Sequence, residues 1–274
     1  MDLNSKSQKH FHCYATANDS RFYSEDLRNL QRIRNIDSGV DSIFLYISIS
    51  QVKKSNLIDR IFIRAVRRMF KEHRSINLME IICKSNIGRD FSSYQTMLEK
   101  VKAISTDDDY ILFQNRSGYG PFRENWYRKF VEQFEKFDSV ALCGSTINFK
   151  DHPSRSSRNN LPHVQTYSFL SNMFFMNMLG EGFPGANETD RNDIITKGEI
   201  GLSQFFLEKN YKITCIEWPN EVITNQSPAV NKADVKKAVT CKHCFYHRRY
   251  FRGFGALPRL LYVSIAKKLH SRTA

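Results

Sequence analysis

The stretch from residue 86 to residue 122 constrains the fold most, because a loop, a helix, an apolar strand and a second loop follow one another within it. An apolar strand predicted at 79–85 leads into the loop 86–90, and a helix predicted at 91–104 follows that loop. Strand–helix–strand order predicts a parallel sheet, whose ligands bind at the carboxyl ends of the strands. Both loops should therefore open on one edge of the sheet.

The same alternation runs through the first half of the chain. Strands are predicted at 10–15, 43–50, 79–85, 110–114 and 139–143, and helices at 24–33, 56–72, 91–104 and 126–137. The helix at 56–72 places Leu57, Ile61, Ala65 and Met69 on one face and arginines on a solvated face. The pattern predicts an α/β fold with a Rossmann-type, mostly parallel sheet flanked by helices.

The pattern weakens after residue 144. The segment 164–179 is predicted as a strand leading into a helix, Glu199 is expected to open a second helix, and the last strand is predicted at 212–218. Two polar, turn-rich segments, 148–162 and 180–198, are expected to be loops near the sheet edge.

Composition favours a folded protein of a reducing compartment. The hydrophobic content of 41% argues against disorder, and no apolar run is long enough to predict a spanning helix. No apolar stretch typical of a signal peptide occurs near the N-terminus, and most of the six cysteines have apolar, strand-like surroundings. We therefore expect a cytoplasmic location.

The net charge of +13 is concentrated at the C-terminal end. Residues 232–274 hold eleven Lys and Arg against one acid, whereas residues 1–231 hold 30 Lys and Arg against 27 Asp and Glu. A body of nearly balanced charge with a basic tail argues against a nucleic-acid-binding domain. We expect one domain at 1–231 and a separate helical tail at 232–274.

The tail interleaves Arg and Lys with Phe, Tyr and Leu, and its last part resembles an interfacial membrane helix. Apolar side chains would enter the headgroup region while the basic ones meet anionic lipid. This predicts a peripheral protein on the inner face of the cell membrane. Two alternatives are a helix packed on the body and nucleic-acid binding by the mixture of aromatic and basic residues.

Five segments together resemble a known family. They are NIGRDFSSYQ, DDDYILFQNRSGYGPF, VALCGSTIN, PHVQTYSFLSNM and EIGLSQFFLEKNYKI, in this order. Over residues 10–217 the chain resembles bacterial surface-polysaccharide glycosyltransferases related to rhamnan synthesis protein F. The resemblance implies a GT-A fold, with a nucleotide-sugar half at about 1–145 and an acceptor half at 146–231.

The resemblance also implies where the donor binds. The expected donor-binding residues are Asn86, Gly88, Arg89, Asp90, Asn115, Arg116 and Ser117. Gly88 would permit a tight turn or the close approach of a ligand, and Asp90 would cap the helix or hold a hydroxyl. Relatives carry a metal-binding Asp-x-Asp where this chain has Gln114 to Ser117. Arg116 thus takes an aspartate position, and it either replaces a divalent metal at the pyrophosphate or lies exposed beside the pocket.

The acceptor half should supply a general base for an inverting transfer. Glu199 is the first candidate, although an acid at a helix start also favours the helix dipole. His163 is the second candidate base, with a structural role as its alternative. Gln165 and Tyr167 are the expected acceptor contacts.

Two clusters have metal-like spacing, yet no metal site is predicted at either. The acidic run 107–109 precedes a strand and should lie at the sheet edge opposite the ligand. Cys241 and Cys244 lie near His243 and His247, but a second Cys-x-x-Cys pair is missing.

The resulting hypothesis is a glycosyltransferase. It would move a hexose or deoxyhexose from a nucleotide sugar to a growing, lipid-linked bacterial polysaccharide of the O-antigen, capsule or rhamnan type. The alternatives are a nucleotidyl- or phosphotransferase on the same fold, and an inactive membrane-bound scaffold in which Arg116 marks a lost site.

Overall fold

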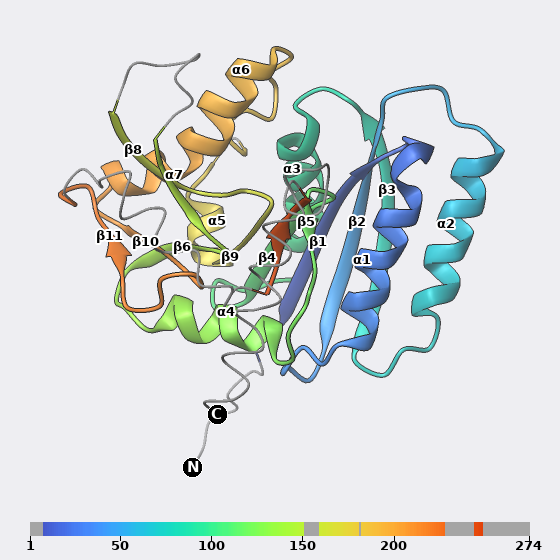
Figure 1. The fold of residues 1–274 in the computed structure, drawn as a ribbon, viewed down its shortest axis with the longest axis horizontal. Coiled ribbons are helices and arrows are strands. Elements are labelled where there is room, and N and C mark those ends of the chain that lie inside the picture. Colours follow the sequence, from blue (N-terminus) through green and yellow to red (C-terminus); the bar gives the residue numbers. More distant parts are fainter. Residues whose placement is uncertain (1–7, 151–158, 181, 228–243, 249–274) are drawn as a thin grey trace, which may run out of the picture.

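The computed structural model describes residues 8–150, 159–180, 182–227 and 244–248. Eight strands form one sheet (Figure 1). In spatial order they are β11 (Val222–Ile223), β10 (Lys212–Cys215), β6 (Val140–Gly144), β9 (Ser168–Asn172), β4 (Tyr110–Asn115), β1 (His10–Ala17), β2 (Ile43–Gln51) and β3 (Ile76–Ser85).

The sheet is mostly parallel. Strands β3, β2, β1 and β4 run in one direction, β9 is antiparallel to both β4 and β6, and β10 is parallel to β6. Strand β11 closes this side as an antiparallel edge. The prediction of a mostly parallel α/β sheet is therefore confirmed, and the carboxyl ends of β1 to β4 share one edge.

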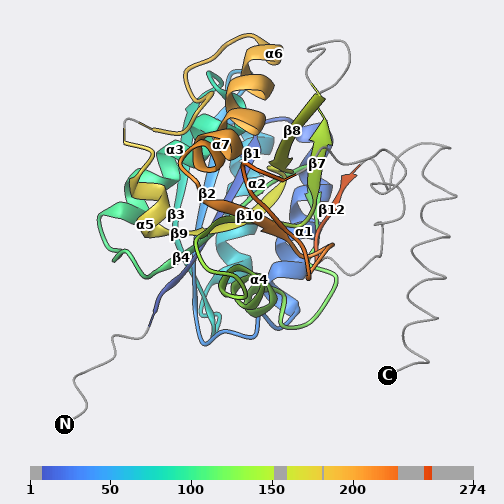
Figure 2. The same ribbon diagram turned by 90° about the vertical axis from the view of Figure 1, so that its left-hand side faces the viewer.

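Helices flank the sheet on both sides. The α-helices are α1 (Tyr23–Asn35), α2 (Leu57–Phe70), α3 (Arg89–Lys102), α4 (Trp126–Glu135), α5 (Met173–Asn177), α6 (Arg191–Asp193) and α7 (Gly201–Glu208). Figure 2 shows α1 and α3 on opposite faces of the sheet. Within the described residues, no helix combines the length and apolar character needed to cross a membrane.

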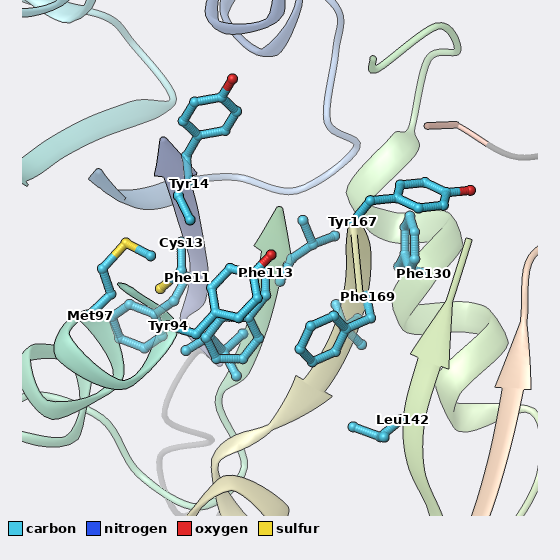
Figure 3. Close-up of a cluster of buried hydrophobic side chains, with 14 of the residues drawn as sticks. Phe11, Cys13, Tyr14, Tyr94, Met97, Phe113, Phe130, Leu142, Tyr167 and Phe169 are labelled. Atoms are coloured by element: carbon cyan, nitrogen blue, oxygen red, sulfur yellow. The ribbon is translucent and has the colours of Figure 1, made fainter. Parts of the chain in front are cut away.

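Aromatic side chains join the two halves of the sheet (Figure 3). The ring of Phe113 on β4 stacks on Phe169 of β9 with centroids 5.0 Å apart, and Tyr94 of α3 lies 5.0 Å from Phe113. All three side chains are fully buried. Since offset and edge-to-face aromatic pairs stabilise a core beyond their buried area, this cluster holds the two halves in one body.

The buried face of α2 differs from the prediction. Leu57 and Ile61 are 66% and 54% exposed, while Phe62, Val66 and Phe70 are buried. Both sets have the spacing of one helix face, so periodicity alone selected the wrong one. The N-terminus of α2 is fixed by a capping box between Asn56 and Asp59.

One segment of the predicted tail contacts the body of the protein. Residues 244–248, here called the C-terminal strap, pack on the body, and their strand β12 (Tyr246–His247) pairs with β5 (Gly118–Tyr119). Cys244 and Phe245 are fully buried. The other parts of the predicted tail, 232–243 and 249–274, lie outside the described residues.

The segments expected as loops contain regular structure. Strands β7 (Ile147–Lys150) and β8 (Asn159–Val164) overlap the two ends of the first segment and pair with each other in antiparallel orientation. A π-helix, Ile194–Ile200, joins α6 to α7 in the second. Glu199 therefore lies inside a continuous helical segment and does not open a helix.

Candidate active site

Two of the predicted donor loops meet at the carboxyl edge of the sheet. Asn115 is the last residue of β4, and its side-chain amide donates to the Asp90 carboxylate at 2.8 Å. The other side of the same amide accepts the Ser117 backbone N–H at 2.8 Å. Asp90 belongs to the first turn of α3. The topology thus joins the end of β4 to the start of α3, as the sequence predicted.

Positive charges surround the Asp90 carboxyl. Burial raises its pKa above the usual value, and four cations act in the opposite direction. They belong to Arg116, Arg248, Arg89 and Lys84. The site therefore presents one half-buried acid within a mostly basic surrounding, which suits an anionic ligand.

Lys84 stands at the end of β3, next to this acid. Burial lowers the pKa of its ammonium to about 8. Its Nζ donates to the Ser50 hydroxyl at 3.2 Å and to the Ile87 carbonyl at 3.3 Å, and the Ser50 hydroxyl lies 3.1 Å from that of Ser93. Sequence reasoning missed Lys84, although its place at the end of a predicted parallel strand was a usable signal.

Arg116 is anchored by a buried carboxylate. Its guanidinium forms an ion pair with Asp26, whose side chain is 1% exposed, and it also donates to the Ala17 carbonyl at 2.9 Å. Hydroxyl groups of Tyr14 and Thr16 donate to the same carboxylate, each at 2.9 Å. The charge of Arg116 is therefore already compensated within the protein. The side chain is 13% exposed, so it does not lie freely beside the pocket.

The C-terminal strap brings a further arginine to this edge. The Arg248 backbone N–H donates to the Ser117 carbonyl at 2.6 Å. The guanidinium groups of Arg248 and Arg116 lie 5.5 Å and 5.1 Å from the ring centroid of Phe22. No carboxylate forms an ion pair with Arg248 among the described residues. Of the two arginines, it is the one whose charge is available to a ligand.

Glycines explain how the strap reaches the site. A Cβ on Gly120 would lie 2.6 Å from the Cys244 carbonyl oxygen, and one on Gly118 would lie 2.4 Å from the Tyr167 carbonyl oxygen. Both glycines allow backbone segments to approach closely. The strap itself is held by Phe245, whose ring centroid lies 5.6 Å from that of Trp126.

The predicted base and one predicted acceptor residue are in contact. The Gln165 side-chain amide donates to the Glu199 carboxylate at 3.0 Å, and both residues are half-buried. Glu199 belongs to the π-helix, a form that occurs frequently at functional sites.

The acceptor loop also adjoins the donor loop. The Asn115 backbone N–H donates to the Tyr167 carbonyl at 3.1 Å, and the Tyr94 hydroxyl donates to the Thr166 carbonyl at 2.9 Å. The charges of both Asp90 and Glu199 raise the pKa of Tyr94, after the larger effect of its burial. The candidate residues of the two halves are therefore neighbours.

The side chains of His163 and Tyr167 are more buried than those of Gln165 and Glu199. His163 is 3% exposed and Tyr167 is 5% exposed. The Nδ1 of His163 lies 2.8 Å from the Leu161 carbonyl, and the Tyr167 hydroxyl lies 3.3 Å from that of Thr146. The ring of Tyr167 also meets the ring of His247 on the strap at 5.5 Å. Both side chains contact other protein groups.

Gly88 serves the protein's own chain. It has a positive φ of 66°, and an added Cβ would lie 1.8 Å from the Ala186 carbonyl oxygen. Its N–H donates to the Glu188 carbonyl at 2.9 Å. The close approach predicted for a ligand is thus made by the backbone of the second half. Asp90 makes no capping bond, because Gly88 is the N-cap residue of α3.

In the described part of the chain, no group of three or more His, Cys, Asp or Glu is placed to hold a metal ion. Asp109 accepts backbone N–H groups of Lys9 and Thr106, each at 2.8 Å, at the amino end of β4. Burial raises the pKa of the Cys244 thiol to about 11. Cys241 and His243 lie outside the described residues.

Comparisons with known proteins identify the fold. No family model matches the sequence, and no curated protein matches it. The mannosyltransferase PcManGT from Pyrobaculum calidifontis, solved with GDP-Man and Mn²⁺, superposes with a TM-score of 0.50 at 10% identity, over 77% of this chain and 55% of that one. Residues 1–349 of S. aureus TarS, solved with UDP, give a TM-score of 0.45 at 10% identity, over 84% and 63%.

The bifunctional glycosyltransferase WbbM gives a TM-score of 0.46 at 10% identity, over 90% of this chain and 46% of its own. The chain thus spans about half to two thirds of the length of these proteins. At 10% identity the likeness concerns the fold alone, and the fold assignment rests on the superposition with the mannosyltransferase. The chain has the mostly parallel, helix-flanked sheet of the GT-A glycosyltransferases.

Proposed function

We propose that this protein transfers a sugar from a nucleotide-sugar donor to an acceptor hydroxyl at the carboxyl edge of its sheet. The observation that carries the proposal is the meeting of two pairs there, Asp90 with Asn115 and Gln165 with Glu199, from opposite halves of the chain. The GT-A fold supports it, since the mannosyltransferase with that fold was solved with a nucleotide sugar.

The donor diphosphate needs positive charge, and the structure supports a protein source for it. Arg248, Lys84 and Arg89 surround Asp90, whereas Arg116 is already paired with Asp26. We therefore propose that the first three residues bind the phosphates. Arg116 would orient the loop that follows β4. Asn86 and Ser117 flank this group, and Asp90 with Asn115 would hold a ribose or sugar hydroxyl.

A divalent metal fits this group of residues poorly. One carboxylate faces four cations, and metal sites for Mg²⁺ or Mn²⁺ are built from several oxygen ligands of negative or neutral charge. Among the described residues, Asp90 belongs to no group of three or more His, Cys, Asp or Glu placed to hold an ion. We propose that cationic side chains compensate the charge of the diphosphate in place of a metal. Arg248, and not Arg116, would have the main part in this.

Glu199 is the proposed general base. The acceptor hydroxyl would attack the anomeric carbon, forming a new C–O bond as the bond to the diphosphate breaks, and its proton would pass to the Glu199 carboxylate. A single displacement of this kind inverts the anomeric carbon. Gln165 orients the carboxylate by donating to it at 3.0 Å. His163 and Tyr167 shape the wall of the acceptor site.

The substrate class follows from the family resemblance. We propose a hexose or deoxyhexose as the donor sugar, and a lipid-linked bacterial surface polysaccharide as the acceptor, at the inner face of the membrane. Residues 232–243 and 249–274 would add basic charge against that membrane.

The test is a binding and turnover experiment on the full chain. Thermal unfolding is followed with UDP-, GDP-, dTDP- and CMP-sugars, each with EDTA and with Mn²⁺. A donor at about 100 times its dissociation constant stabilises the folded state by about 2.7 kcal/mol. We expect stabilisation by one nucleotide class in EDTA, and Glu199→Gln should keep that stabilisation while turnover falls about 10²- to 10⁴-fold.

The other outcomes separate the alternatives. Stabilisation that requires Mn²⁺ would contradict the role given to the arginines. Turnover of a nucleoside triphosphate without a sugar acceptor would indicate a nucleotidyl- or phosphotransferase. Silence across the panel, together with unchanged behaviour of Glu199→Gln, would indicate a scaffold that has lost its site.

A further inference from the structure

Large apolar side chains are exposed around the N-terminal end of α2. Val52, Leu57, Ile58 and Ile61 are 47%, 66%, 51% and 54% exposed, and Ile87 is 50% exposed. Strand β2 pairs with β3 as far as Gln51 and Ser85, so the loops that follow the two strands begin side by side. These five residues form what we call the α2 surface. Contiguous exposed apolar groups mark interaction sites.

The exposed charged side chains of residues 51–68 are all basic. Six basic residues occur between positions 51 and 68, all of them exposed: Lys53, Lys54, Arg60, Arg64, Arg67 and Arg68. The single acid of that stretch, Asp59, is buried, where it accepts the Tyr23 hydroxyl at 2.7 Å. An occupant of this surface must therefore combine apolar depth with negative charge.

Helix geometry arranges the two kinds of side chain together. Leu57, Ile61, Arg64 and Arg68 follow one another at spacings of three and four residues, and so lie on one exposed face of α2. The apolar residues occupy its first turns and the arginines its later turns. The long stems of Lys and Arg permit the charges to reach a headgroup layer while the apolar tips lie deeper.

We propose that the α2 surface docks on a membrane that contains anionic lipid. A bilayer provides both requirements at once: apolar depth for Leu57 and Ile61, and anionic headgroups for the basic residues. Figure 1 shows the loop before α2 at the same end of the sheet as the tips of β1 and β3. Docking there would hold the candidate active site toward the lipid headgroups. This inference does not depend on the basic tail or on sugar transfer.

The apolar contribution is tested by co-sedimentation of the full chain with phosphatidylcholine vesicles that contain or lack phosphatidylglycerol. The double substitution L57S/I61S should lower binding to the anionic vesicles by about tenfold or more. The matched control I104S/F174S changes two residues that are 39% and 46% exposed and follow α3 and β9 at the opposite edge. It should bind as the unchanged protein does.

The charge contribution has its own pair of variants. K54Q/R64Q should lower binding to anionic vesicles by about tenfold or more. On vesicles of phosphatidylcholine alone, this variant and the unchanged protein should bind equally. K71Q/R74Q removes the same charge at the far end of the helix and should have a much smaller effect.

Four results would overturn the proposal. The first is a failure of the unchanged protein to bind vesicles, and the second is undiminished binding by L57S/I61S. The third is a loss of binding in both control variants that equals the loss in their test variants, and the fourth is equal binding to charged and neutral vesicles. A dimer in light scattering that L57S/I61S dissociates, without vesicle binding, would identify a second copy as the occupant. Donor stabilisation of L57S/I61S should equal that of the unchanged protein, which separates this test from that of the proposed function.

Discussion

Arg116 shows how one residue can have a different role from the one its position in a motif suggests. The family resemblance in the sequence gives it the place of an aspartate in a metal-binding motif. In the structure it compensates the charge of Asp26, a carboxylate that belongs to no motif recognised in the sequence. That pairing could not be predicted, because it joins the loop after β4 to α1 across the sheet edge.

Arg116→Gln should therefore destabilise the fold. Removing one partner of a buried ion pair leaves the other charge uncompensated and costs about 3–5 kcal/mol. Urea denaturation would measure the loss in unfolding free energy, and Asp26→Asn in the Arg116→Gln background should restore part of it. Full stability of Arg116→Gln with a selective loss of donor affinity would instead make Arg116 a ligand contact.

Lys84 gives the site a pH dependence. Burial lowers its pKa from 10.5 to about 8, so the folded state favours the neutral amine. Between pH 8 and 10.5 the unfolded state binds more protons, and this group makes the unfolding free energy rise with pH. Ligand binding responds in the opposite direction, since a diphosphate needs the charged form.

We expect the affinity for a nucleoside diphosphate to fall between pH 7 and pH 9 as Lys84 loses its proton. Lys84→Arg should remove most of that fall, because a guanidinium stays charged over this range. Isothermal titration at several pH values measures both, with the nucleoside alone as the control. An identical fall in the Lys84→Arg variant would show that another group is responsible.

At the scale of elements, periodicity predicted most of the first half of the chain. Strand β4 and helix α3 fall within two residues of their predicted bounds. Helix α2 shows the limit of periodicity. The pair Leu57 and Ile61 has the same spacing as the pair Phe62 and Val66, and only the packing decides which pair is buried. The strap was missed because its pairing with β5 is remote in sequence.

The C-terminal strap should contribute to stability as an ordinary core element does. Phe245 is fully buried against Trp126 and Phe130, with ring centroids 5.6 Å and 6.1 Å away. Phe245→Ala should lower the unfolding free energy by about 3–5 kcal/mol, measured in urea. Phe174→Ala is a matched control, because that ring is 46% exposed. Equal stability of the two variants would show that the strap is not part of the core.

At the scale of the whole molecule, the predicted nucleotide and acceptor halves share one sheet. Strand β9 pairs with β4 on one side and with β6 on the other, and the Phe113–Phe169 stack crosses the first of these pairings. The candidate site also spans the halves. Unfolding one half would therefore expose the core of the other, so both should unfold in one transition.

The two tryptophans allow a direct test, because each reports on one half. Trp126 is fully buried at the start of α4, and Trp218 packs on Phe149 with ring centroids 5.1 Å apart. In Trp218→Phe and in Trp126→Phe, the remaining fluorescence should change at the same urea concentration as that variant's own far-UV circular dichroism. A nucleotide donor should move both transitions together. If the fluorescence of one variant alone changes before its dichroism, the half that holds the remaining tryptophan unfolds independently. The site would then lie between two separate units.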